Sequence, residues 1–172
     1  MIKRLLVPLD GSKLAEEALV VAGDLAESLN GTLVLARVVP PPIPGRFYAP
    51  GLLEQVQEAQ AKEAEAYLAS VAQRLSEDRL TVETCVLRGE VAKTLVAFAE
   101  RERCQLIAIA SHGLGGLGWH VFGSVAQKLL QAARCPVVVV RPTPDVFDRE
   151  EETEEQQADA VLLSELREGG KS

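Results

Sequence analysis

Short apolar runs alternate along the chain with longer segments in which apolar residues recur every three or four positions. The short runs end in turn-forming residues and indicate buried β-strands, whereas the periodic segments indicate helices with one buried face. Ser12 is placed to cap the first helix, and Asn30-Gly31 is typical of its end. Strands are predicted at residues 2–9, 32–39, 80–87, 106–110 and 137–140, and helices at 14–29, 52–75, 91–103 and 124–134.

The strict alternation of strand and helix predicts an α/β fold. Nearly continuous apolar strands are typical of a parallel sheet covered on both faces, and right-handed crossovers leave few topologies. We therefore expect a single doubly wound, Rossmann-like domain with a five-stranded parallel sheet. In such sheets ligands bind beyond the carboxyl ends of the strands, where the strand order reverses. The segments that we expect to share this edge are Pro8–Asp10, Val38–Val39, Arg88–Gly89 and Ala110–Gly113.

A glycine-rich segment between the fourth strand and the fourth helix is the strongest candidate for a binding site. It begins Ala110-Ser111-His112-Gly113, and Gly123-Ser124 follows after nine further residues. Glycine lets the backbone approach a ligand closely and adopt positive φ. The unpaired amides and the dipole at a helix start attract anions. The sequence therefore indicates a place to hold phosphate.

Three side chains around this segment have two interpretations each. Asp10 follows the first strand, where it could accept a ribose hydroxyl or hold Mg²⁺ through water, or only stabilise the start of the first helix. Ser124 offers a hydroxyl and an amide to phosphate, or serves as an ordinary helix cap. His112 donates to a phosphate, or is a solvated or structural loop histidine.

Three motifs resemble those of the universal stress protein family, over a stretch from about Lys3 to Arg141. The first is the opening strand and turn, Leu6–Ser12, with the sequence LVPLDGS. The second is similar to the nucleotide motif of the ATP-binding branch: glycine, two residues, glycine, nine residues, glycine, then serine or threonine, with Ala110 in place of the first glycine. The third is the closing strand, Cys135–Val140.

The resemblance implies an adenine nucleotide alpha hydrolase-like fold and a cytosolic stress-response protein that binds ATP. It also implies a nucleotide-responsive regulatory homodimer, paired through the fifth strands, which acts on an unidentified protein partner. Asp10 would lie near the ribose, and it could also hold Mg²⁺ through a water molecule. The positions that match the family's nucleotide site are Pro8, Leu9, Asp10, Val38, Ile109, Ala110, His112, Gly113, Gly123, Ser124 and Val125.

The alanine at position 110 leaves the strength of binding open. If the position requires positive φ, alanine costs on the order of 1 kcal/mol, whereas at negative φ nothing is lost. A dimeric scaffold without nucleotide is therefore one alternative. A slow ATPase is another, with Asp10 and His112 as the obvious candidates to act on water. The chain has no GxxxxGK[ST] loop and hence no phosphate-binding lysine of that type.

Composition divides the 172 residues into two parts. Residues 1–143 hold equal numbers of basic and acidic side chains and are predicted to form the universal stress protein domain. Residues 144–172 carry the whole net charge of −7 and are expected to be an acidic, partly helical tail. Neither part has the basic face that nucleic acid requires. No apolar run reaches the length of about 18 residues that a membrane span needs, and three widely spaced cysteines are typical of reduced thiols in the cytoplasm.

Overall fold

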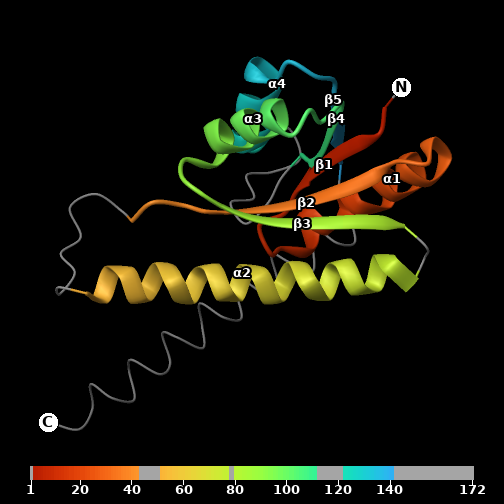
Figure 1. Cartoon of the computed structure of the whole chain (residues 1–172). Helices are drawn as coiled ribbons and strands as arrows, with labels where there is room; N and C mark the ends of the chain where they lie inside the picture. The colour runs from red at the N-terminus through yellow and green to blue at the C-terminus, as the bar shows by residue number, and fades with distance from the viewer. Residues whose placement is uncertain (1, 43–50, 78–79, 112–121, 142–172) are drawn as a thin grey trace, which may run out of the picture.

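The computed structural model describes residues 2–42, 51–77, 80–111 and 122–141. All the predicted elements are present (Figure 1), with end residues that differ by at most two from the prediction. The helices that follow β3 and β4 stop two residues earlier than predicted. The elements are β1 (Arg4–Pro8), α1 (Lys13–Leu29), β2 (Thr32–Val39), α2 (Leu52–Glu77), β3 (Thr81–Arg88), α3 (Val91–Arg101), β4 (Leu106–Ala110), α4 (Ser124–Ala132) and β5 (Val137–Val140).

The five strands form one parallel sheet in the order β3-β2-β1-β4-β5. The chain begins in the middle of the sheet, builds outward through β2 and β3, and then returns to the other side of β1 for β4 and β5. The strand order thus reverses between β1 and β4, which is where such folds place a ligand. The predicted doubly wound, Rossmann-like sheet is confirmed.

Two hydrophobic layers hold the helices on opposite faces of this sheet. Leu5 and Val7 of β1 pack in one layer with α1 and α2, and Leu6 packs in the other with α3 and α4. This alternation follows from the two-residue period of a strand. Figure 1 shows α3 and α4 on the side of the sheet opposite α2. Because both faces are covered, the open edges at the strand ends are where a ligand can enter.

Local signals in the sequence fix both ends of α1. The Oγ atom of Ser12 accepts a hydrogen bond from the amide of Ala15 at 3.0 Å, as expected of a helix cap. Asn30 adopts a left-handed φ of 47°, and Gly31 donates to the carbonyl of Ala26 at 2.8 Å. The turn before α1, which carries Asp10, is therefore anchored against the end of β1.

Cys85, Cys104 and Cys135 are free thiols. Burial raises the pKa of Cys85, Cys104 and Cys135 above the ordinary thiol value. In the described part of the chain, no helix combines the length and the apolar composition needed to cross a bilayer. The predicted acidic tail, residues 144–172, lies outside the described residues.

Candidate functional site

A cavity of about 480 Å³ opens at the carboxyl ends of β1, β2 and β4. Its volume lies in the range of small-molecule sites, roughly 300–1,000 Å³. It brings together nine of the eleven residues predicted for the nucleotide site, whereas His112 and Gly113 lie outside the described residues. Those nine are Pro8, Leu9, Asp10, Val38, Ile109, Ala110, Gly123, Ser124 and Val125.

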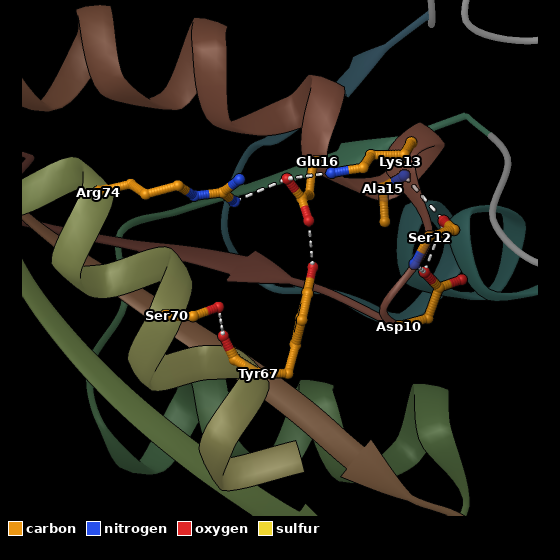
Figure 2. A network of polar contacts seen from close by, with 8 residues as sticks. All are labelled: Asp10, Ser12, Lys13, Ala15, Glu16, Tyr67, Ser70 and Arg74. Atoms are coloured by element: carbon orange, nitrogen blue, oxygen red, sulfur yellow. Dashed lines mark hydrogen bonds and ion pairs between the residues drawn. The ribbon is translucent and has the colours of Figure 1, made fainter. Parts of the chain in front are cut away.

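The turn after β1 carries Asp10, which lines the cavity and contacts Ser12 (Figure 2). The Oδ1 atom of Asp10 accepts hydrogen bonds from the amide of Ser12 at 3.0 Å and from its hydroxyl at 2.7 Å. The same hydroxyl accepts from the amide of Ala15, so one chain of hydrogen bonds joins the carboxylate to the first turn of α1. Asp10 therefore supports the helix start and also lines the cavity, which combines the two interpretations of this residue.

On the other side of β1, the first turn of α4 faces the cavity. Gly123 is the N-cap of α4, with φ −56° and ψ 151°, and no side chain among the described residues makes a capping hydrogen bond there. Ser124 is the first helical residue, so the alternative that it caps the helix is wrong. Ser124 lines the cavity instead, beside amides that a helix start leaves unpaired. This arrangement suits an anion.

Ala110 fits its place without strain. It is the last residue of β4, is paired with Val140 of β5 and is 3% exposed. Among the described residues other than glycine, only Asn30 and Arg103 have positive φ. The structure therefore selects the alternative in which alanine costs no backbone strain at this position.

Arg37 of β2 also lines the cavity, although the sequence analysis did not include it. Its guanidinium donates to the Oε1 atom of Glu63 on α2 at 3.0 Å and lies 5.2 Å from the ring centre of Tyr67. It also packs against Gly11, because a Cβ atom at that glycine would stand 3.3 Å from Nη1 of Arg37. Gly11 has a φ of 100°, so both its conformation and its neighbour favour glycine.

A second polar cluster joins α2 to α1 beside this turn (Figure 2). The hydroxyl of Tyr67 donates to Oε1 of Glu16 at 3.1 Å, and Arg74 donates to Oε2 of Glu16 at 2.8 Å. Burial and the negative charge of Glu16 raise the pKa of Tyr67 well above its ordinary value. The cluster holds α2, and with it Glu63, against the cavity.

One feature of the sequence could have marked Arg37 as a site residue: it is a charged residue inside an otherwise apolar strand. The sequence of β2 is TLVLARVV, and an arginine in such a strand, partly removed from solvent, needs a partner. That partner comes from α2, together with Gln60, which lines the same wall. The position of α2 depends on tertiary packing, so the pair itself is not readable from spacing along the chain.

The cavity thus combines apolar walls with three kinds of polar group. A carboxylate accepts hydroxyls, a helix start binds anions, and a guanidinium binds anions or stacks on rings. In the part of the chain that the structure describes, no three His, Cys, Asp or Glu side chains form a group suited to a metal ion. A magnesium ion there would depend on oxygens of a bound ligand as well as on Asp10.

The fold and the site define a class of protein: an α/β protein with a ligand-sized cavity where the strand order reverses. The chain belongs to the universal stress protein family, whose family model matches residues 1–141. It is 31% identical to universal stress protein MJ0531 of Methanocaldococcus jannaschii over 140 residues, which cover 81% of this chain and 82% of that protein.

Solved structures of the family have the same fold. The chain is similar to universal stress protein UspA from Lactobacillus plantarum, with a TM-score of 0.72, 22% identity and coverage of 81% of this chain and 97% of that one. A universal stress protein solved in complex with cAMP matches with a TM-score of 0.62, 22% identity and coverage of 82% and 98%. A family protein from Arabidopsis thaliana with AMP bound matches with a TM-score of 0.60, 14% identity and coverage of 83% and 94%.

Proposed function

We propose that this chain binds an adenine nucleotide, ATP foremost, in the cavity at the ends of β1, β2 and β4. The observation that carries the proposal is the placement of the Asp10 carboxylate and the start of α4 around one cavity with apolar walls. A nucleotide has the matching chemistry, since it joins an apolar base, a hydroxyl-bearing sugar and an anionic phosphate chain. The AMP and cAMP complexes of two structural neighbours support the choice of adenine nucleotides.

Each part of the ligand has a partner in this arrangement. Leu9, Val38 and Ile109 supply the apolar surface for the base, and Asp10 accepts from the ribose hydroxyls. Gly123 and Ser124 bind the phosphates through the helix start. Mg²⁺, when bound, would neutralise phosphate charge and take Asp10 as a ligand through water.

Binding rather than turnover is the proposed activity. Hydrolysis requires a group that orients the attacking water, and among the described cavity residues Asp10 is the one candidate of this type that the sequence suggested. Its Oδ1 atom already accepts from the amide and the hydroxyl of Ser12. The carboxylate is therefore better placed to hold a ligand than to exchange protons with water.

Titration calorimetry of nucleotide-free protein with ATP and Mg²⁺ tests the proposal. We expect saturable binding of one nucleotide per chain, weakened by Asp10→Ala and unchanged in Val20→Ala, whose side chain is 65% exposed on α1 away from the cavity. The absence of saturable binding at millimolar ATP would overturn the proposal. Phosphate release that Asp10→Ala does not reduce would indicate a contaminating ATPase.

The proposed regulatory unit is a homodimer that pairs through β5. This strand pairs with β4 on one side, while its outer side has no partner among the described residues. A second copy of β5 would satisfy the unpaired backbone groups there. Because Ser111, which follows β4, donates to Val140 of β5 at 2.7 Å, the cavity and the proposed interface share one structural element. Nucleotide binding would act on an unidentified protein partner through this dimer, in the reducing cytosol that the free thiols suit.

A further inference from the structure

Arg37 gives the cavity a positive charge far from the helix start that binds anions. Among the described residues that line the cavity, it is the one cation. Arg37 lies on β2 and Gly123 follows β4, and β1 runs between these two strands. The turn that carries Asp10 therefore has an anion-binding group on each side. A nucleotide whose phosphates lie at α4 brings its ribose toward Asp10, and the guanidinium of Arg37 lies beyond.

The guanidinium lies beside the turn that carries Asp10, whose carboxylate the proposed function assigns to the ribose. It packs on Gly11, the residue directly after Asp10, and a side chain at Gly11 would displace it. In dinucleotide-binding folds, an acidic residue that faces the ribose selects free hydroxyls, whereas a nearby arginine accommodates a ribose phosphate. The cavity of this chain is lined by an acidic residue, Asp10, and by an arginine, Arg37.

The present partner of Arg37 is easily exchanged for a ligand. The side chain of Glu63 is 67% exposed, whereas that of Arg37 is 18% exposed. An ion pair with a solvated partner contributes roughly 0–1 kcal/mol, so Glu63 can turn away at little cost. Arg37 itself stays in place because it lies over the ring of Tyr67. Its planar fork of donors then suits two oxygens of one phosphate.

We propose that Arg37 determines specificity by admitting adenine nucleotides that carry a second phosphate on the 2′ or 3′ oxygen of the ribose. The proposal rests on the nucleotide site proposed above. The phosphate takes the place of the Glu63 carboxylate on the guanidinium, while the 5′ phosphate remains at the start of α4. The negative charge of Asp10 repels a second phosphate on the ribose. A preference for nucleotides with that phosphate therefore depends on the positive charge of Arg37.

Calorimetry with AMP, adenosine 2′,5′-bisphosphate and adenosine 3′,5′-bisphosphate tests this assignment on the full chain. We expect one bisphosphate to bind about tenfold more tightly than AMP, as a charge-assisted phosphate contact allows. Which isomer is preferred tells which ribose oxygen faces Arg37. Arg37→Gln should lower bisphosphate affinity much more than AMP affinity and so remove the preference, and Glu63→Gln should increase the preference.

Three results would overturn the assignment. Bisphosphates that bind the wild type no more tightly than AMP would do so, and the proposed function would stand. An equal loss of AMP and bisphosphate affinity in Arg37→Gln would make Arg37 a structural residue of the turn. Failure of all the nucleotides to bind would remove both proposals. If Arg37→Gln does not fold, Arg37→Lys keeps the charge without the planar fork, and it should reduce the preference but not AMP binding.

Discussion

The amide of Gly123 donates a hydrogen bond to the carbonyl of Ser111 at 2.7 Å. This bond joins the two ends of the segment between β4 and α4, and it places the first turn of α4 directly beyond β4. Ser111 is 2% exposed and donates in turn to Val140 of β5, so the junction is part of the core. The structure therefore assigns a structural role to the amide hydrogen of Gly123. Its φ of −56° and ψ of 151° are accessible to other residues.

Replacing Gly123 with proline tests this role. Proline accepts a φ near −56°, but it has no amide hydrogen, so the hydrogen bond to the carbonyl of Ser111 is lost. We expect Gly123→Pro to lower the free energy of unfolding by about 1–3 kcal/mol and to weaken nucleotide binding. Gly123→Ala keeps the amide and should stay near the wild type in stability. Equal urea midpoints for the two variants would show that the bond to Ser111 does not hold the junction.

Restoring the family's glycine at position 110 should not improve binding. Ala110 lies in β4 with ordinary strand φ, so glycine gains no conformation that alanine lacks. Glycine in a strand is less stable by about 0.5–1 kcal/mol, and the buried methyl group is lost as well. We expect Ala110→Gly to lower the melting temperature by roughly 2–4 °C and to leave the ATP affinity within about twofold. A gain of tenfold or more in affinity would show that the methyl group crowds the ligand.

Parts of the site that depend on local sequence were predictable, and parts that depend on packing between distant elements were not. The strand ends that form the cavity, such as Pro8 and Val38, followed from apolar runs and from the rule for the ends of parallel strands, whereas Ile109 followed only from the family resemblance. The cap at Ser12 followed from residue type. The wall formed by Arg37 and Glu63 did not, because these residues meet only through the docking of α2 on the sheet. Local patterns predict elements and their ends, whereas side-chain pairs between distant elements require the packed fold.

Two substitutions at Asp10 separate its two roles. Asparagine keeps a side-chain oxygen that can accept from the amide and hydroxyl of Ser12, while it removes the charge. We expect Asp10→Asn to retain stability within about 1 kcal/mol and to lose affinity for the Mg²⁺ complex of ATP. Asp10→Ala should lose both the turn contacts and the binding. The measurements are urea unfolding and calorimetry with and without Mg²⁺, and an unchanged magnesium dependence in Asp10→Asn would exclude a role for the carboxylate with the metal.

Tyr67 should make stability decline at alkaline pH. The ordinary value for a tyrosine pKa is 10.0, and burial together with Glu16 raises the pKa of Tyr67 above it in the folded chain. The unfolded state therefore loses its proton first, so the stabilisation is complete below about pH 10 and is lost as the pH rises through the folded value. Tyr67→Phe should be less stable at pH 8 by about 1 kcal/mol, because the bond to Glu16 is absent.

The difference between wild type and Tyr67→Phe in urea should then narrow above about pH 10. Phenylalanine keeps the ring beneath Arg37 and removes only the hydroxyl, so packing changes little. Arg74→Gln is a control on the same carboxylate, since it breaks a different contact of Glu16 and keeps the hydroxyl of Tyr67. A difference for Tyr67→Phe that is constant from pH 8 to pH 11 would contradict the assigned cause.

The backbone of β5 allows a sharp test of the proposed dimer. Ile107 of β4 donates to the carbonyl of Pro136, and Ser111 donates to that of Val140, so even-numbered residues of this segment face β4. In a parallel pair, the N–H and C=O groups of one residue point to the same side of the strand, and those of the next residue point to the opposite side. The N–H and C=O groups of Val137 and Val139 therefore point away from β4. Proline is tolerated on an edge strand where its missing amide would face away from the sheet.

We therefore expect Val139→Pro to remain folded and to sediment as a monomer at concentrations where the wild type is a dimer. Val139→Ala removes more of the side chain but keeps the outward amide, so it should remain dimeric and control for lost packing. Val138→Pro removes an amide that faces β4, so it should destabilise the fold itself by about 3 kcal/mol or more. Sedimentation velocity across a concentration series, with thermal unfolding alongside, distinguishes these outcomes. A dimer of undiminished affinity in folded Val139→Pro would place the interface elsewhere, because no pairing through the outer edge of β5 can keep its full set of hydrogen bonds without that amide.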